Sequence, residues 1–379
     1  MALFFIIVFT IYFLVNLYIF LKGYYIAGQQ KEWKFAYTLS FILLSSLFIV
    51  GKSLERSHPS VFSNIFNVAG GFWLAFMLYG FLFFLLSDII WLIVRITGLL
   101  STEKIITYRK WAYFVGLALS VFIILTGFIN ALIPVVRHYN ISINKPAGNI
   151  KSFRIVAVSD IHLGSIIRKR SIKKLSDILR DAKPDAIFLL GDIVDGEIGP
   201  VMRNDLLKYF TCPKCRDGIV AITGNHEYIG GAEVTIPYIE KNGIRILKDE
   251  IIIYEDFIQV IGRLDRDASR FRGTKREHLE KLMEKADRSK PAIVLDHQPL
   301  NLDEAVKAGV DLQLSGHTHN GQMWPLNYIT KMIYEVSYGY KKIGNTQFIV
   351  SSGYGLWGPR VRLGSRSEII VADITFTGN

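Results

Sequence analysis

Four long apolar stretches in the first third of the chain constrain its fold more than any other feature. They cover residues 3–21, 35–51, 65–94 and 111–136. About 20 apolar residues cross the hydrocarbon core of a bilayer, and each stretch comes near or exceeds that length. The first stretch has no basic segment before it and is longer than the apolar part of a signal peptide. Residues 1–136 are therefore predicted to form a transmembrane domain of four spans.

The charge of the chain follows the same division. Residues 1–150 hold 11 of the 44 Lys and Arg residues but only 4 of the 33 Asp and Glu residues, which places +7 of the net charge of +11 in the apolar part. This balance is typical of charged loops that flank membrane spans. Residues after 150 show no basic stripe interleaved with aromatic side chains, so we expect no nucleic-acid partner. Asp88 is the one carboxylate inside a predicted span, and we expect it to face the other helices or an interface.

After the fourth span the sequence pattern changes. Residues 137–152 are polar and contain Pro146 and Gly148, so they are predicted to form a linker. From residue 153 onward, short apolar runs alternate with amphipathic helical segments. Such runs are typical of strands that are buried on both faces of an α/β domain. This domain is predicted to cover residues 153–379.

Polar side chains follow five of the predicted strands directly. The strands cover residues 153–158, 186–190, 218–222, 292–296 and 310–315. In open α/β sheets, ligands bind outside the carboxyl ends of the strands. We therefore expect a single rim to carry Asp160, His162, Asp192, Asp195, Asn225, His226, His297, His317 and His319.

The types of these side chains indicate metal chemistry. Imidazole, carboxylate and amide donors without a thiolate suit borderline to hard divalent cations such as manganese, iron or zinc. The donors are more numerous than one tetrahedral site needs. They suit two metals that share a bridging carboxylate, the arrangement of two-metal phosphoester hydrolysis. Each short motif alone is common in turns, but five in order, each directly after a strand, favour one shared site.

This ordered set of motifs resembles that of the calcineurin-like metallophosphoesterase superfamily. The motifs are DIH at 160–162, GDIVD at 191–195, GNHE at 224–227, His297, and GHTH at 316–319. The resemblance covers about residues 153–375. It implies a four-layer α-β-β-α sandwich and a hydrolase of phosphoric esters or diphosphates. It also implies in-line attack of a metal-bridging hydroxide on phosphorus.

The resemblance assigns a role to each rim residue. The first of two divalent metals would take Asp160, His162, Asp192 and His319. The second would take Asp192, Asn225, His297 and His317, with Asp192 bridging the two. His226 would contact the phosphoryl group and protonate or stabilise the leaving oxygen, and Asp195 would orient its surroundings. We expect manganese, with iron or zinc as alternatives.

A glycine-rich segment at 351–368 also resembles a bacterial envelope-associated branch of the superfamily, together with NGQMWP at 320–325. Relatives in that branch include lipid-linked pyrophosphatases and phosphodiesterases. One interpretation is an aromatic and cationic lip that binds a phosphorylated lipid. The other is a loop packed on the sheet edge, with its arginines in solvent. The residues concerned are Trp324, Trp357, Arg360, Arg362 and Arg366.

These features together predict a multi-pass membrane protein that is a metal-dependent phosphohydrolase. We expect it to cleave a phosphodiester or pyrophosphate bond of a lipid-linked or envelope substrate. One alternative is a phosphomonoesterase that acts on similar membrane substrates. Another is a membrane receptor or scaffold with a vestigial metal site, although such a module would not need seven ligands as well as His226.

Loop charges bear on the side of the membrane that the catalytic domain faces. Loops 22–34 and 95–110 hold seven Lys and Arg residues and loop 51–64 holds two, which favours an extracytoplasmic domain. When the basic residues after the fourth span are counted with loop 51–64, the difference between the two sides shrinks to seven Lys and Arg residues against six. Because similar envelope proteins are exported, we still expect the catalytic domain to lie outside. Cys212 and Cys215 form a CPKC motif that is predicted to lie in a loop, with a local disulfide if that loop faces an oxidising compartment.

Overall fold

The computed structural model divides the chain into a helical unit and an α/β unit. It describes residues 2–27, 30–58, 60–99, 102–211, 215 and 218–378. The helical unit comprises the residues up to Ile129 together with the short segment Gly358–Val361. The α/β unit comprises Asn130–Trp357 and the residues from Arg362 onward.

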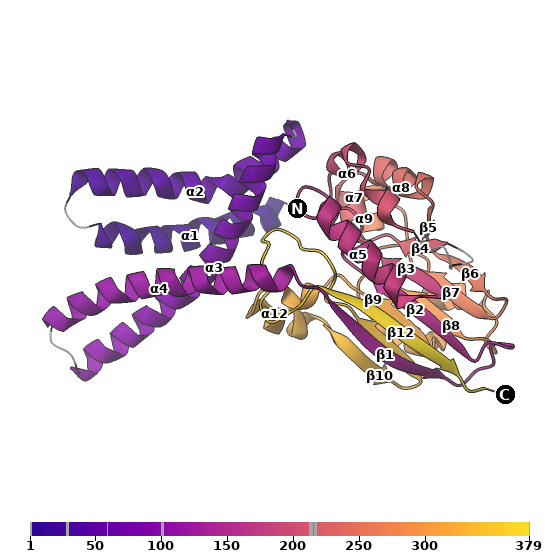
Figure 1. The fold of residues 1–379 in the computed structure, drawn as a ribbon. Coiled ribbons are helices and arrows are strands. Elements are labelled where there is room, and N and C mark those ends of the chain that lie inside the picture. The colour runs from indigo at the N-terminus through magenta and orange to yellow at the C-terminus, as the bar shows by residue number, and fades with distance from the viewer. Residues whose placement is uncertain are drawn as a thin grey trace. The chain divides into compact units, whose positions relative to one another are not determined.

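Four long helices make up the first part of the chain (Figure 1). They are α1 (Ala2–Ile26), α2 (Lys31–Ser57), α3 (Val61–Thr97) and α4 (Thr102–Ala131). All four are long and apolar enough to cross a membrane. Many of their large apolar side chains are exposed, which suits helices whose surroundings are as apolar as the side chains themselves. The prediction of four apolar helices that are long enough to cross a membrane is confirmed.

Polar side chains within the helical unit are paired with one another. Asp88 on α3 accepts a hydrogen bond of 2.6 Å from the Tyr18 hydroxyl and forms an ion pair with Lys22, both on α1. Trp73 donates its indole N–H to the Asn16 side chain at 2.9 Å. Charges and dipoles in an apolar environment need such partners. Asp88 therefore faces another helix, one of the two positions expected for it.

Two six-stranded sheets form the centre of the α/β unit. The first has the order β1-β12-β2-β3-β4-β5. Its strands are β1 (Val135–Ile143), β2 (Ser152–Val158), β3 (Ala186–Leu190), β4 (Ile219–Ile222), β5 (Ile244–Leu247) and β12 (Glu368–Phe376). The second has the order β10-β11-β9-β8-β7-β6. Its strands are β6 (Glu250–Tyr254), β7 (Ile258–Gly262), β8 (Ala292–Leu295), β9 (Leu312–Ser315), β10 (Gly339–Ile343) and β11 (Thr346–Val350).

Helices cover the outer face of each sheet. Those on the first sheet include α5 (Lys169–Ala182), α6 (Gly199–Arg203), α7 (Asn225–Ile229) and α8 (Ala232–Lys241). Those on the second are α10 (Leu279–Met283) and α11 (Leu302–Ala308). Between the sheets lies a core of buried apolar side chains from both, including Phe188 and Leu314. The predicted four-layer sandwich is confirmed, and strands buried on both faces explain the continuous apolar runs in the sequence.

Residues 137–152 do not form the predicted linker. Residues 135–143 form β1, which pairs in parallel with β12 along its whole length. Ile141 and Ile143 at its end are buried between the sheets, whereas most other side chains of this edge strand face outward. The sequence pattern did not predict this strand, because most of its side chains are exposed and only its last residues show the alternation of a half-buried strand. The α/β unit therefore begins at the end of α4 and has no separate linker before it.

Candidate metal centre

The ends of five strands bring the predicted rim residues together. Asp160 and His162 follow β2, and Asp192 and Asp195 follow β3. Asn225 and His226 open α7 directly after β4. His297 follows β8, and His317 and His319 follow β9. Both sheets contribute, so the site lies where the carboxyl ends of two sets of parallel strands meet.

The turns that carry these residues have an unusual backbone conformation. Positive φ values of 53°, 50°, 50°, 69° and 48° occur at Asp160, His162, Asp192, His317 and His319. A left-handed conformation costs a non-glycine residue on the order of 1–3 kcal/mol and tends to cluster at functional sites. Close packing adds a further constraint, since a Cβ at Gly224 would lie 2.2 Å from Asp192 Oδ1. These strained turns direct the side chains toward one common site.

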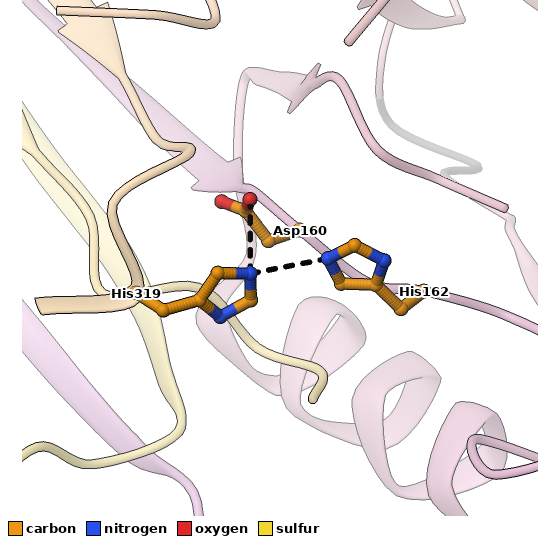
Figure 2. A group of neighbouring side chains, drawn as sticks. All are labelled: Asp160, His162 and His319. Carbon is orange, nitrogen blue, oxygen red and sulfur yellow. Dashed lines mark hydrogen bonds and ion pairs between the residues drawn. The ribbon is translucent and has the colours of Figure 1, made fainter. Parts of the chain in front are cut away.

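The first group of donor atoms consists of Asp160, His162 and His319 (Figure 2). His319 Nε2 lies 3.1 Å from His162 Nε2 and 3.3 Å from Asp160 Oδ1. All three side chains are buried. The Asp160 carboxylate also accepts the backbone N–H of His317 at 3.0 Å, which fixes its orientation. These three residues could hold one metal ion.

The second group of donor atoms is built around Asp192. His297 Nε2 lies 3.3 Å from Asp192 Oδ2, and His317 Nδ1 lies 3.0 Å from Asn225 Oδ1. Asp192, His297 and His317 could hold another metal ion. Asp192 Oδ2 is also 3.8 Å from Nε2 of His162, a member of the first group. The Asp192 carboxylate therefore borders both groups.

His297 shows that the second group fits a cation. Its Nδ1 lies 2.6 Å from the carbonyl oxygen of Leu190, so Nδ1 carries the proton that this bond needs. Its buried Nε2 then presents a lone pair and has no hydrogen-bond donor among the described residues. Metal-binding histidines are typically oriented in this way, with one nitrogen on a carbonyl and the other on the metal.

The electrostatics differ between the imidazoles of the two groups. Burial would lower the pKa of His297, but the charge of Asp192 outweighs it and raises the pKa well above its usual range. Burial alone would raise the pKa of Asp192, but His297 and His226 hold it well below its usual range. Burial, reinforced by His162 and Arg362, holds the pKa of His319 well below its usual range. Burial and His297 lower the pKa of His317 to about 4. The lowered pKa values keep Asp192, His317 and His319 deprotonated, the form of a donor that binds metal ions.

Asp195 lies between two histidines of the centre. Its Oδ1 is 3.3 Å from His226 Nδ1 and 3.5 Å from His162 Nδ1. Burial would lower the pKa of His226, but the charges of Asp192 and Asp195 outweigh it and raise the pKa to about 9. Asp195 is placed to orient both rings, and the His226 side chain remains partly exposed to the pocket.

Glu227 also belongs to the centre, although the motifs alone assign it no role. Its buried carboxylate accepts the backbone N–H groups of Asp192 at 3.0 Å, Ile193 at 2.8 Å, Val194 at 3.1 Å and Gly224 at 2.7 Å. It thereby ties the turn after β3 to the start of α7 and fixes the position of Asp192. Burial and the charge of Asp192 raise the pKa of Glu227 to about 7. The signal in the sequence was an acidic residue three positions after a helix N-cap.

A pocket of about 360 Å³ opens at this centre. One part of its lining consists of Asp192, Asn225, His226, His317, Thr318 and His319. The other part is largely apolar and comes mainly from α12 (Leu326–Ile333). It includes Leu326, Ile329, Thr330, Ile333, Tyr334 and Trp357. Polar donors and an apolar wall thus share one cavity.

The residues predicted to form a substrate lip have different positions. Trp357 lines the pocket and is 49% exposed. Trp324 is similarly exposed and lies just before α12. Arg360 belongs to the segment that is part of the helical unit, where its guanidinium lies 5.8 Å from the centre of the Phe128 ring. Arg366 donates to the carbonyl of Ile133 at 3.0 Å.

The prediction that Arg362 lies at an exposed lip is wrong. Its side chain is fully buried. The guanidinium donates to the carbonyl oxygens of Ser352, Gly353 and Gly355, and Nη2 lies 3.2 Å from His319 Nδ1. The glycine-rich loop turns its carbonyl groups inward, where buried acceptors need a donor. Arg362 therefore packs behind a proposed metal ligand instead of contacting substrate from solvent.

Comparisons with known proteins agree with this geometry. Residues 153–321 match the family model of the calcineurin-like phosphoesterases. An uncharacterized metallophosphoesterase of Aquifex aeolicus is 32% identical over 64% of this chain and 93% of its own length. Another, from Helicobacter pylori, is 30% identical over 90% of each chain. A bovine transmembrane protein with metallophosphoesterase domain is 30% identical over 69% of this chain and 62% of its own.

The chain belongs to the calcineurin-like metallophosphoesterase family. Fold, donor groups and relatives agree on a metal-dependent phosphoester hydrolase attached to a helical membrane unit.

The role of Glu227 generates a prediction about metal affinity. Glu227→Gln replaces one acceptor oxygen by an NH2 group that faces backbone N–H donors, so the turn that carries Asp192 should loosen. We expect affinity for Mn²⁺ to fall by about 10- to 100-fold, the usual effect of removing a group that orients a ligand. Competition with a fluorescent chelator measures it. Glu280→Gln, an exposed change on α10, is the control, and equal affinities in the two variants would contradict this role.

Proposed function

We propose that this protein is a membrane-anchored hydrolase that uses two divalent cations to cleave a phosphodiester or pyrophosphate bond of a lipid-linked or envelope substrate. The observation that carries the proposal is the pocket. It is bordered by His319 of the first donor group, by Asp192 and His317 of the second, and by an apolar wall from α12. A phosphate attached to an apolar group suits such a cavity, and four membrane-spanning helices in the same chain bring it near lipids.

We assign the ligands of the two cations from the two donor groups. Those of the first are Asp160, His162, Asp192 and His319. Those of the second are Asp192, Asn225, His297 and His317. Manganese is proposed, with iron or zinc as alternatives, because carboxylate, imidazole and amide donors suit these ions. When bound, the cations would lower the pKa of the attacking water and offset charge in the transition state.

The remaining polar residues act on the substrate or on their neighbours. His226 lines the pocket without belonging to either ligand set, and we propose that it protonates or stabilises the leaving oxygen. Asp195 orients the His226 ring through the contact at Nδ1. Glu227 and Arg362 are positioning residues, because the first holds the turn of Asp192 and the second lies against His319.

We propose that the α/β unit faces the outside of the cell. The basic residues of loops 22–34 and 95–110 support a cytoplasmic position for those loops, which places both ends of a four-span chain outside. Cys215 is disulfide-bonded, a state that persists in oxidising compartments. Cys212 lies outside the described residues.

The assignment of Asp192 as the bridging ligand predicts different metal contents for two variants. Asp192→Ala should lose both metals, and Asp160→Ala should chiefly lose one. Elemental analysis of the purified full-length protein measures the metal-to-protein ratio. Two metals retained in Asp192→Ala would contradict the assignment.

The wild type loaded with Mn²⁺ should hydrolyse bis(p-nitrophenyl) phosphate. Hydrolysis of the monoester alone would favour a phosphomonoesterase, and no hydrolysis of either would favour a receptor with a vestigial site.

The role of His226 predicts a loss of rate without a loss of metal. His226→Asn should retain both cations, while kcat falls by about 10²- to 10⁴-fold, the range for a positioned proton donor. The loss should shrink for substrates with acidic leaving groups, because these leave without a proton. A series of aryl phosphodiesters of graded leaving-group pKa measures this dependence. The same loss across the whole series would count against the acid role.

The proposed orientation predicts which positions an impermeant thiol reagent reaches in intact cells. In a chain with Cys212 and Cys215 replaced by Ser, a cysteine at the exposed Val234 of α8 should be labelled. A cysteine at Lys31, between the first two spans, should be protected until the membrane is broken. The opposite pattern would place the α/β unit in the cytoplasm.

A further inference from the structure

The helix α12 presents large apolar side chains to the surface beside the metal centre. Tyr328, Ile329 and Ile333 are about half exposed, and Met332 is 78% exposed. No residue of the helix is buried. Burial of apolar surface is the main gain from packing a helix on a domain. Contacts within the α/β unit therefore do not account for this apolar sequence, and an exposed cluster of this kind indicates a binding surface.

Side chains of α12 also line the pocket. Leu326, Ile329 and Ile333 line the cavity opposite the donor groups, so Ile329 and Ile333 belong both to the pocket wall and to the exposed face. The volume of about 360 Å³ is at the low end for a ligand site. It accommodates a phosphoryl group and the first atoms of a chain. Any longer apolar chain has to continue along the exposed face of α12.

The composition of this face suits the headgroup region of a bilayer. Trp324 and Tyr328 are aromatic residues of the kind that concentrate at membrane interfaces. Lys331 Nζ lies 5.9 Å from the centre of the Tyr328 ring, which adds a cation next to the apolar side chains. Apolar, aromatic and basic residues together are typical of helices that lie in the membrane surface.

A short connection ties the α/β unit to the end of a membrane-spanning helix. The membrane-spanning helix α4 ends at Ala131, and β1 begins at Val135. Four residues span at most ~14 Å when fully extended. The α/β unit is thus tethered close to the membrane surface, so lipid is a partner within reach of the exposed face.

We propose that α12 inserts its exposed face into the headgroup region of the bilayer and that its pocket face binds the apolar chain of the substrate. The substrate class is then an amphiphile whose scissile phosphate is attached close to an acyl or polyprenyl chain. The phosphate part of this inference rests on the proposed function. The membrane contact does not, because it follows from the exposed face and the tether alone.

Insertion is tested by a spin label at position 332. The full-length chain with Cys212 and Cys215 replaced by Ser carries Met332→Cys, labelled with a nitroxide, in vesicles of phosphatidylglycerol and phosphatidylethanolamine. We expect the label to be accessible to oxygen and shielded from a water-soluble nickel chelate. The control label at Val234 on α8 should be accessible to nickel. A label at 332 that is equally accessible to nickel, or shielded from both reagents as in a protein contact, would overturn the membrane contact.

The binding of the chain is tested with two substrates of matched chemistry. Tyr328→Glu and Met332→Glu alter side chains outside the pocket lining, so hydrolysis of bis(p-nitrophenyl) phosphate should be unchanged. For hexadecyl p-nitrophenyl phosphate in the same vesicles, kcat/KM should fall by about tenfold or more, because a carboxylate resists entry into the bilayer. Val234→Glu should affect neither substrate. Equal losses on both substrates, or no loss on either, would overturn the proposal.

The two experiments distinguish failure of the proposed function from failure of the membrane contact. A wild-type protein that hydrolyses neither substrate counts against the phosphodiester assignment, whereas the spin label at position 332 still decides the membrane contact.

Discussion

The carboxylate of Asp192 is the point around which the metal centre is arranged. A buried charge is costly unless it is paired and hydrogen-bonded. Asp192 accepts the backbone N–H of His226 at 2.8 Å and faces imidazole nitrogens of both donor groups. A second buried carboxylate, Glu227, holds its turn by four backbone hydrogen bonds. Two adjacent buried carboxylates repel each other, and this repulsion adds to the effect of burial in raising the pKa of Glu227. Divalent cations relieve that repulsion, so the same arrangement that disfavours the metal-free centre favours its loading.

The cluster forms only because the fold brings the ends of several separate strands together. Five strands from two sheets end at one rim, and the residues after them adopt left-handed turns that a rigid sandwich can impose. The apolar core packed between the sheets supports that rigidity. Glycine is required where these turns touch, as at Gly316, where a Cβ would overlap Ser159 Oγ. Arg362 closes the back of the centre by binding the inward carbonyl groups of the glycine-rich loop.

The lining of the pocket limits which substrates suit the metal centre. Metal donors occupy one part of its lining and α12 the other, so a ligand that satisfies both is polar at one end and apolar at the other. The exposed side of α12 extends the apolar surface beyond the cavity. Both proposals for the substrate follow from this arrangement, and both depend on a chain that already contains its own membrane spans.

The sequence by itself determined the features that local chemistry controls. The length of the apolar stretches identified four spans, and the polar residues after each apolar strand gathered the donor set, because strand ends and ligand types are local properties. The tertiary structure alone decided the rest. β1 is recognisable only through its pairing with β12, since most of its side chains face outward. Arg362 looked like a surface cation, but its burial depends on carbonyl groups from four other residues. Glu227 gains its role from a turn more than 30 residues away, and α12 becomes informative only when its exposed face is seen beside the pocket. Each of these depends on which distant segments meet, a property that periodicity and short motifs do not encode.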